Sequence, residues 1–375
     1  MRIGILGGGQ LAKMTAVAAA QLGIESLVWS TTEGQPALQA CTRSVIGSLD
    51  NPSVQDRIID GSDVITLENE FIPATILHQL QARGGTVLPS PESVAVVQDK
   101  WTQKSALAAQ GLPVAEGRAL TDISDIAAVE RDLGFTLAVK TRRLGYDGHG
   151  TFRTESAAEL AALFQTLNPS PDLLMAERSV SFSREISVLV TRAGNDALVT
   201  YPVVETRQPQ LVCEEVLAPA PLPNAGSVRA KEIAERAVRA LNLVGTAAVE
   251  MFMLADGLVL INEIAPRPHN SGHFSIEACQ TSQFENHVRA ITDLPLGSAA
   301  MQSPAAVMVN ILGRLEGPIT PTDLAPALAV EGAHVHLYGK SVSRPMRKLG
   351  HITVMAPTLE QARERALAAR DALRF

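Results

Sequence analysis

The chain has 375 residues, of which 46% are hydrophobic and 19% are charged, and its formal net charge is −7 at pH 7. This composition is typical of a folded globular protein, and the length predicts two or three domains rather than one core. The negative charge excludes a general affinity for nucleic acid or anionic membranes. The cysteines (Cys41, Cys213 and Cys279) form no CxxC pair, no apolar run approaches the roughly 20 residues that span a bilayer, and no signal peptide is visible, so we expect a cytoplasmic protein.

The N-terminal segment predicts the start of a βαβ unit. A short apolar strand, Arg2–Leu6, leads into the turn Gly7-Gly8-Gly9 and then into a helix. This G-x-G-x-x-A pattern also occurs where dinucleotides bind, but such a site needs an acidic residue at the end of the second strand. Ser30 and Thr31 stand at that point instead. An NAD-dependent oxidoreductase is therefore disfavoured, and a phosphate site or a plain tight turn is favoured.

A second candidate ligand-binding edge follows the predicted buried strand Val64–Leu67. Glu68-Asn69-Glu70 comes directly after this strand. Ligands bind at the carboxyl ends of strands in open α/β sheets, although an exposed acidic loop has the same pattern. Pro89 and Pro91 then interrupt the chain, which places a candidate domain boundary near residue 90.

The middle of the chain has features of a nucleotide site. Lys100 opens a predicted helix, Lys140 closes an apolar strand, and the loop Gly145–Gly150 contains three glycines. Backbone N–H groups of such a loop can approach phosphates, and the lysines supply positive charge; a simple hairpin is the alternative. The strand edges at Glu177 and Glu185 could contact an adenine and its ribose, although their spacing does not require it.

The segment Val249–His273 predicts a β-hairpin with two facing carboxylates. Asp256-Gly257 lies between two apolar runs and predicts a two-residue turn. With this turn at the tip, Glu250 stands directly opposite Glu263. Four apolar residues are then expected to share their face: Phe252, Leu254, Val259 and Ile261. Opposed like charges destabilise a sheet, so we expect either a divalent cation between them or a carboxylate that pairs with arginine or faces solvent.

The C-terminal segment contains a basic cluster in an otherwise acidic protein. Two predicted strands, Val335–Tyr338 and His351–Met355, are joined by a connection that carries cations. These are Lys340, Arg344, Arg347 and Lys348. A solvated face is the ordinary interpretation of such a cluster. The net charge disfavours nucleic acid, and a single bound phosphate is enough to explain it.

Five strings in collinear order resemble one enzyme family, and the resemblance runs from residue 3 to about residue 356. The strings are GGGQLAKM, TRRLGYDGHG, INEIAPRPHNSGH, SQFENHVRAITDLPLG and YGKSVSRPMRKLGHI. They are similar to the N5-carboxyaminoimidazole ribonucleotide synthetases of the ATP-grasp superfamily, which act in purine biosynthesis. The resemblance implies an α/β and α+β fold. Its implied domains are a Rossmann-like pre-ATP-grasp domain (1–98), an ATP-grasp domain (99–300, with a lid at about 113–180) and a small β-rich C-terminal domain (301–375).

The resemblance also implies substrates and a cofactor. Family members join 5-aminoimidazole ribonucleotide, bicarbonate and ATP, and release ADP and phosphate, and they form homodimers. Glu250 and Glu263 would hold Mg²⁺, or Mn²⁺ in its place. The residues implied for ATP are Lys100, Lys140, Gly145, Tyr146, Asp147, Gly148, His149, Gly150, Glu177, Arg178, Ser179, Val180, Glu185, Gln208, Asn262 and Glu263. Those implied for the ribonucleotide are Gln10, Leu11, Glu70, Asn270, Ser271, Lys340, Arg347 and Lys348.

The chain departs from the family pattern at four positions. Lys100 stands where many relatives carry arginine. His149 replaces a basic loop residue, so the charge there depends on pH. Gln208 stands near the nucleotide where other members have histidine. Ala265 replaces an asparagine of the wider superfamily, so water or phosphate oxygens must complete the coordination of the metal.

Three residues are candidates for catalysis. Arg267 and His269 follow Glu263 closely enough to bind bicarbonate or the developing phosphate. Asp147, in the loop that closes over the site, is the candidate that orients the ribonucleotide amine and accepts its proton. A turn residue and a buried histidine are the structural alternatives for Asp147 and His269. A formate-transferring ligase of the same fold and a non-catalytic nucleotide sensor are the alternative functions.

Overall fold

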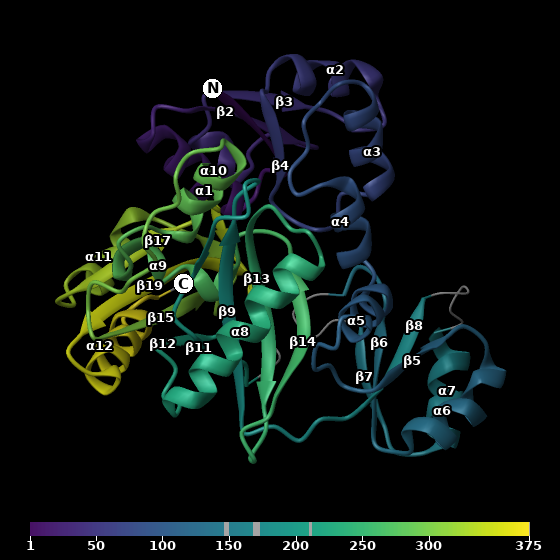
Figure 1. Ribbon diagram of the computed structural model, residues 1–375. Helices are drawn as coiled ribbons and strands as arrows, with labels where there is room; N and C mark the ends of the chain where they lie inside the picture. Colours follow the sequence, from purple (N-terminus) through teal and green to yellow (C-terminus); the bar gives the residue numbers. More distant parts are fainter. Residues whose placement is uncertain (146–149, 168–172, 210–211, 375) are drawn as a thin grey trace.

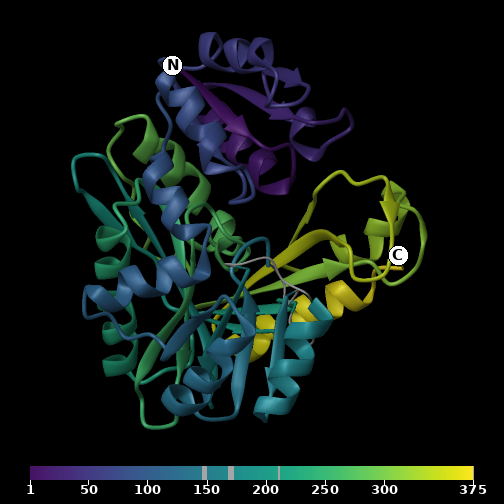
Figure 2. The same ribbon diagram turned by 90° about the vertical axis from the view of Figure 1, so that its right-hand side faces the viewer.

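The computed structural model describes residues 1–145, 150–167, 173–209 and 212–374 (Figure 1). The described residues form a four-stranded parallel sheet, a nine-stranded sheet, a separate four-stranded sheet and a two-stranded ribbon. The parallel sheet lies above the nine-stranded sheet in Figures 1 and 2. Within this part of the chain, no helix is both long and apolar enough to cross a membrane.

The N-terminal region is a parallel sheet with helices on both faces. Its elements are β1 (Arg2–Leu6), α1 (Gln10–Gln21), β2 (Glu25–Ser30), η1 (Pro36–Gln39), β3 (Arg43–Ile46), α2 (Pro52–Asp60), β4 (Val64–Leu67), α3 (Ala74–Ala82) and α4 (Pro91–Val97). The strand order is β3-β2-β1-β4. Apolar residues of α1 and of α10 (Gln283–Ile291) pack on one face, and those of α2 and α3 pack on the other. The strands are buried on both faces, as parallel strands require.

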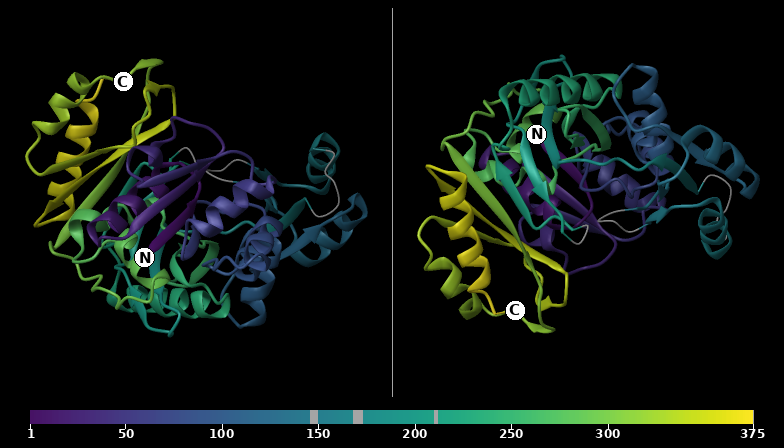
Figure 3. Two further views of the ribbon diagram at one scale, coloured as in Figure 1. Left: turned by 90° about the horizontal axis from the view of Figure 1, so that it is seen from above. Right: turned by 90° about the horizontal axis from the view of Figure 1, so that it is seen from below.

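The lid is a small antiparallel sheet that projects from the body of the molecule (Figure 3). It follows α5 (Lys100–Ala109) and consists of β5 (Gly117–Leu120), η2 (Ile123–Asp125), α6 (Ile126–Leu133), β6 (Leu137–Thr141), β7 (Thr151–Thr154), α7 (Ala157–Leu167) and β8 (Leu174–Arg178). The strand order is β5-β8-β6-β7. Apolar residues of α6 and α7 pack against one face of this sheet. Its other face therefore remains for polar side chains of β6 and β8.

The nine-stranded sheet joins the middle and the C-terminal parts of the chain. Its strands are β9 (Arg184–Arg192), β10 (Leu198–Thr200), β11 (Val204–Arg207), β12 (Glu215–Ala218), β13 (Gly245–Met253), β14 (Val259–Ala265), β15 (Ala305–Leu312), β17 (Ala333–Leu337) and β19 (Lys348–Ala356). The same part of the chain contains the helices α8 (Asn224–Ala240), η3 (Asn270–Gly272), α9 (Ser275–Ala278), η4 (Pro321–Leu324), α11 (Ala325–Leu328) and α12 (Leu359–Asp371). The strands β16 (Gly317–Pro318) and β18 (Val342–Ser343) form the separate two-stranded ribbon. The order in the nine-stranded sheet is β14-β13-β9-β11-β12-β15-β19-β17, with β10 on β9. The C-terminal strands thus extend the central sheet through the β12–β15 pair.

Candidate active site

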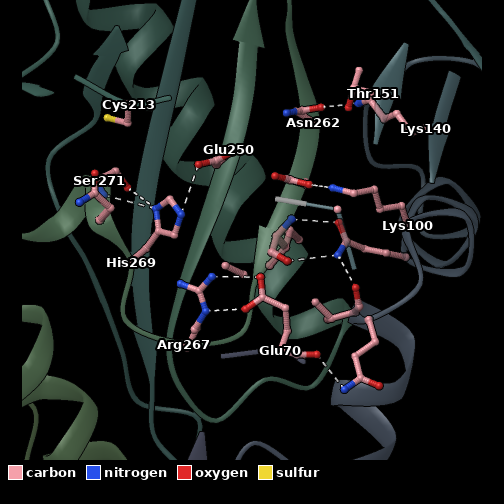
Figure 4. Close-up of a pocket in the computed structure, with 18 of the residues that line it drawn as sticks. Glu70, Lys100, Lys140, Thr151, Cys213, Glu250, Asn262, Arg267, His269 and Ser271 are labelled. Atoms are coloured by element: carbon pink, nitrogen blue, oxygen red, sulfur yellow. Dashed lines mark hydrogen bonds and ion pairs between the residues drawn. The ribbon is translucent and has the colours of Figure 1, made fainter. Parts of the chain in front are cut away.

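A cavity of about 460 Å³ opens between the lid, the hairpin β13–β14 and the edge of the N-terminal sheet (Figure 4). Predicted site residues that are far apart in the sequence line this cavity together. They are Glu70, Lys100, Lys140, Gly145, Glu185, Gln208, Glu250, Asn262, Glu263, Arg267, His269, Asn270, Ser271 and Lys348.

Glu250 and Glu263 are opposite one another in the β13–β14 pair, which confirms the predicted register at this point. The predicted two-residue turn is wrong. The N–H of Leu254 donates to Leu258 O at 2.8 Å and Gly257 has φ of +82°, so the loop has three residues, with its glycine in the left-handed region. A β-bulge between Glu250 and Met251 then adds one residue to β14 and shifts the register back. The extra loop residue and the bulge residue shift the register in opposite directions, so Glu250 and Glu263 still lie opposite one another.

The extra residue of the loop also changes which apolar side chains share the face of Glu250, because Val259 and Ile261 lie between the loop and the bulge. Phe252 lines the cavity and lies opposite Leu260. Val259 and Ile261 pack into the core below the sheet instead. Their predicted place beside Glu250 is wrong, because one extra residue inverts the alternation of side chains along a strand.

The two carboxylates suit a cation that arrives with a nucleotide. Lys100 forms an ion pair with Glu263. Among the described residues, no group of three or more His, Cys, Asp or Glu side chains could hold a metal ion by itself. Mg²⁺ in phosphate-transfer sites is commonly bound by one or two carboxylates, with phosphate and water oxygens as its other ligands. The pair therefore fits a nucleotide-bound cation better than a metal site built from protein alone.

Two lysines face the hairpin from the other wall of the cavity (Figure 4). Lys140 Nζ donates to Asn262 Oδ1 at 3.0 Å, and Asn262 is the extra residue of the bulge. Lys140 also forms an ion pair with Glu177. Burial and the charge of Lys140 lower the pKa of Lys100 to about 8. This wall thus carries positive charge that is partly balanced by carboxylates.

Arg267 and Glu70 form a partly buried bidentate pair that links the segment after β14 to the edge of β4 (Figure 4). Arg267 Nη2 donates to Glu70 Oε1 at 3.0 Å, and Arg267 Nε donates to Oε2 at 2.5 Å. Burial lowers the pKa of Arg267, but the carboxylates of Glu70, Glu68 and Glu250 together outweigh burial and raise it. An arginine has five N–H donors, so this pairing still leaves donors for a ligand.

His269 is a neutral imidazole that points toward Glu250 (Figure 4). Burial, Arg267 and Lys348 lower the pKa of His269 well below its usual value. Its Nδ1 lies 2.9 Å from Ser271 Oγ and 3.4 Å from the backbone N of Ser271. We assign Nδ1 as the acceptor of the backbone N–H, and this assignment puts the proton on Nε2. Nε2 lies 3.5 Å from Glu250 Oε1. His269 is therefore arranged to donate a hydrogen bond at the cavity.

The predicted ribonucleotide residues lie in two groups. Glu70, Asn270, Ser271 and Lys348 line the cavity, whereas Gln10, Leu11, Lys340 and Arg347 are not part of its lining. The basic segment of the second group folds back onto the N-terminal region, where Lys13 Nζ donates to Tyr338 O at 3.3 Å and Gln39 Nε2 donates to Gly339 O at 3.2 Å. The segment at Tyr338–Gly339 is thus held against the N-terminal region.

The glycine turn after β1 is occupied by a carboxylate of the chain itself. The N–H of Gly9 donates to Glu68 Oε2 at 2.5 Å. A Cβ at Gly9 would lie 2.0 Å from Glu68 Oε1, so any other residue there would displace the Glu68 carboxylate. A pyrophosphate would need this same N–H group at the start of α1. The arrangement counts against a dinucleotide at the turn.

Other predicted nucleotide residues are not in the cavity lining. Tyr146, Asp147, Gly148 and His149 lie outside the described residues. Gly150 has φ of +79° and its Cβ would meet Thr141 Oγ1 at 2.3 Å, so the end of the loop needs glycine. Glu177 is buried between lysines. Arg178, Ser179 and Val180 line a second pocket, together with Phe182. Burial and Glu250 raise the pKa of Glu185, which does line the cavity, to about 7.

Two features of this region were missed in the sequence. Lys104 is buried and pairs with Glu177 at 2.9 Å. The spacing of four residues between Lys100 and Lys104 puts both on one side of α5, which was a usable signal. Phe182 and Phe252 stack with ring centroids 4.6 Å apart, although they lie in different strands or loops. Nothing in the local sequence pairs these two rings.

The paired carboxylates on a large antiparallel sheet, facing lysines from a small lid sheet, define the class: an ATP-grasp enzyme. Three family models match the chain: the ribonucleotide synthetase preATP-grasp domain at residues 1–98, the ATP-grasp domain at 105–284 and the phosphoribosylaminoimidazole carboxylase C-terminal domain at 306–365. The predicted fold class is thus confirmed. The domain limits at residues 98/99 and 300/301 stay predictions.

Comparison with individual proteins identifies the family within the ATP-grasp enzymes. The chain is 41% identical over 353 residues to the N5-carboxyaminoimidazole ribonucleotide synthase of Synechococcus elongatus, a match that covers 94% of this chain and 89% of the relative. The synthetase structure from Thermus thermophilus is 34% identical with a TM-score of 0.90 and coverage of 100% and 99%. The Aspergillus clavatus synthase, solved with ADP and 5-aminoimidazole ribonucleotide, is 35% identical with a TM-score of 0.89 and coverage of 99% and 98%. The chain belongs to the N5-carboxyaminoimidazole ribonucleotide synthase family.

Proposed function

We propose that this protein uses ATP to carboxylate 5-aminoimidazole ribonucleotide with bicarbonate in purine biosynthesis. The products are N5-carboxyaminoimidazole ribonucleotide, ADP and phosphate. The observation that carries the proposal is the opposed pair Glu250–Glu263 in a cavity that Lys100, Lys140 and Arg267 also line. Membership of the synthase family supports the same reaction.

The nucleotide half of the cavity binds the triphosphate. Lys100 and Lys140 contact the phosphates, and Glu250 and Glu263 hold Mg²⁺, or Mn²⁺ in its place. When bound, this cation neutralises the charge that builds up on the phosphate oxygens during transfer. The lysines place the γ-phosphate within reach of the segment after β14.

Arg267 and His269 bind bicarbonate beside the γ-phosphate. An oxygen of bicarbonate attacks the γ-phosphorus, the bond from phosphorus to the bridging oxygen of ADP breaks, and carboxyphosphate forms. The N–H donors of Arg267 and the Nε2–H of neutral His269 stabilise the negative oxygens of this intermediate. The side chains hold the reactants in line, which is most of what phosphate transfer requires of a protein.

The ribonucleotide amine then attacks the carbonyl carbon of carboxyphosphate. The new bond is C–N, and inorganic phosphate leaves with the electron pair of the broken C–O bond. Asp147 takes the amine proton in this proposal. It lies outside the described residues, so its role is a prediction: Asp147→Ala abolishes the carboxylated product while the protein stays folded. Normal product formation by this variant would remove Asp147 from the mechanism.

The basic segment holds the 5′-phosphate of the ribonucleotide. Lys340, Arg347 and Lys348 supply the positive charge, and Gln10 with Leu11 closes the other side. The contacts of this segment with Lys13 and Gln39 support the placement, because they bring it against the N-terminal turn. A homodimer in the cytoplasm is part of the same proposal, on family grounds.

The test is ADP release by the purified protein with ATP, Mg²⁺, bicarbonate and 5-aminoimidazole ribonucleotide. We expect release to require both bicarbonate and the ribonucleotide, and a carboxylated product in equal amount. Formate in place of bicarbonate serves as the comparison, since formate transfer is the alternative activity. ADP release that ignores both substrates, or that formate supports equally well, would overturn the proposal.

A further inference from the structure

Lys104 is a buried cation to which the proposed reaction gives no role. Its side chain is 7% exposed, and its Nζ lies 2.9 Å from Glu177 Oε2. The side chain passes over Gly117 of β5, where a Cβ would lie 3.4 Å from Lys104 Cδ and 3.1 Å from Ala176 O. The lysine stem packs directly against the backbone of β5 at this glycine. The lysine is thus built into the contact between α5 and the lid sheet.

Glu177 connects Lys104 to Lys140. Its Oε1 pairs with Lys140 while its Oε2 faces Lys104. In the β6–β8 register Ala138 stands opposite Glu177, so Lys140, two residues further on, is on the same face of the lid sheet. Burial raises the pKa of Glu177, but the ammonium groups of Lys140 and Lys104 outweigh burial and lower it. The carboxylate is therefore ionised between two cations.

This arrangement decides how freely Lys140 can meet a phosphate. Two donors of Lys140 point to Asn262 Oδ1 and to Glu177, and the side chain also lines the cavity. A buried carboxylate with one cationic partner holds that partner strongly, because separation leaves an unpaired charge in a poorly solvated place. Lys104 gives Glu177 a second partner. Lys140 can then direct an N–H donor toward a ligand, because Glu177 keeps Lys104 as a partner.

We propose that Lys104 is a positioning residue for the nucleotide: it keeps Glu177 neutralised, so that Glu177 and Asn262 orient Lys140 without competing with phosphate for it. Lys104 itself is absent from the cavity lining and acts through Glu177. The inference rests on the proposed use of ATP.

The first test is Lys104→Met, with Lys104→Gln beside it because the amide keeps a polar donor but no charge. We expect both variants to raise KM for ATP and the Kd for ADP by about tenfold, which is the affinity that one well-placed charged contact contributes. We expect KM for the ribonucleotide to stay within about twofold of the wild-type value. Lys231→Met, on α8, is the matched control and changes neither constant. Thermal unfolding checks that each variant is folded. If Lys104→Met does not fold, Lys104→Gln must show the tenfold rise in KM for ATP and in the Kd for ADP.

The decisive test adds Glu177→Gln to Lys104→Met. Without the charge of Glu177, Lys140 is released, so the double variant binds ADP more tightly than Lys104→Met alone. A merely structural role for Lys104 predicts no such recovery. Equal rises in KM for both substrates, unchanged ADP binding or no recovery in the double variant would overturn the inference. Wild-type protein that fails to bind ADP would overturn the proposed function instead, so the two failures are distinguishable.

Discussion

The two halves of the proposed site balance charge in different ways. In the nucleotide half, Lys100 and Lys140 pair with the carboxylates of Glu263 and Glu177. In the ribonucleotide half, Lys340 Nζ donates to Lys348 O at 2.7 Å and Arg347 Nη1 donates to Val342 O at 2.7 Å. Carboxylates cancel positive charge, whereas backbone carbonyls orient a cation and leave its charge in place.

The difference matches the two ligands of the proposed reaction. ATP arrives with a divalent cation, so its site needs carboxylates as well as lysines, and a nearly balanced wall suffices. A 5′-phosphate arrives without a metal, so its site depends on the positive charge of the protein, and Lys340 and Arg347 are oriented there by backbone carbonyls. Lysine and arginine side chains therefore have different roles in the two halves, depending on whether carboxylates or backbone carbonyls are their partners. Substitutions in each half test this difference.

The largest effect is expected from the nucleotide half. Glu263→Gln removes one of the two carboxylates that hold the cation and should lower kcat by about a hundredfold or more, the usual cost of losing a group that stabilises the transferred phosphate. ADP release at saturating substrates measures it. Glu316→Gln, an exposed glutamate near the C-terminal ribbon, is the control and should match wild type. A kcat for Glu263→Gln within tenfold of wild type would contradict the role of the hairpin.

The hairpin also shows what sequence reasoning could predict. Opposed Glu250 and Glu263 followed from one turn signal, yet the turn was wrong and the bulge at Asn262 restored the register. A bulge has no reliable local pattern, because it depends on how the neighbouring strand and Lys140 meet Asn262. The pairing of β12 with β15 was equally invisible, since it joins residues nearly a hundred positions apart. The sequence strings were enough to predict the fold class. The bulge and the β12–β15 pairing depend on tertiary contacts and could not be predicted from them.

Local charge spacing explains the remaining misses and successes. Lys100 was predicted from its place at the start of a predicted helix and from the family resemblance, and the structure places it in the cavity lining. Lys104 on the same helix was not predicted, because its partner Glu177 comes from a strand of the lid. Glu68 was noticed as an edge acid, but its hydrogen bond to Gly9 required the folded β1–β4 pair. Partners that are distant in the sequence are what a single sequence hides.

A smaller effect is expected at the border between the halves, where Arg267 binds Glu70. Arg267→Lys keeps the charge but loses the planar fork that holds Glu70 through two hydrogen bonds. It should lower kcat/KM for bicarbonate by roughly 10- to 100-fold, while KM for ATP changes by less than about threefold. Initial rates at varied bicarbonate measure this. Equal loss for bicarbonate and ATP would place Arg267 in the nucleotide half instead.

The smallest effect is a pH dependence that belongs to the ribonucleotide half. Burial, together with Arg347 and Lys348, lowers the pKa of Lys340 to about 8. The ammonium form binds phosphate and the neutral amine does not, so kcat/KM for the ribonucleotide should fall as the pH rises through about 8.

The rates are measured at saturating ATP, because the pKa of Lys100 in the nucleotide half is also lowered to about 8. At lower ATP concentrations, loss of the charge on Lys100 would weaken ATP binding and add a second pH-dependent fall in rate. Lys340→Arg keeps its charge throughout this range and should remove the fall. Lys340→Gln should be about tenfold weaker at pH 7, with a profile that no longer changes near pH 8. A fall that persists unchanged in Lys340→Arg would assign the titration to another group. The protonation of Lys340 would then not control binding of the ribonucleotide.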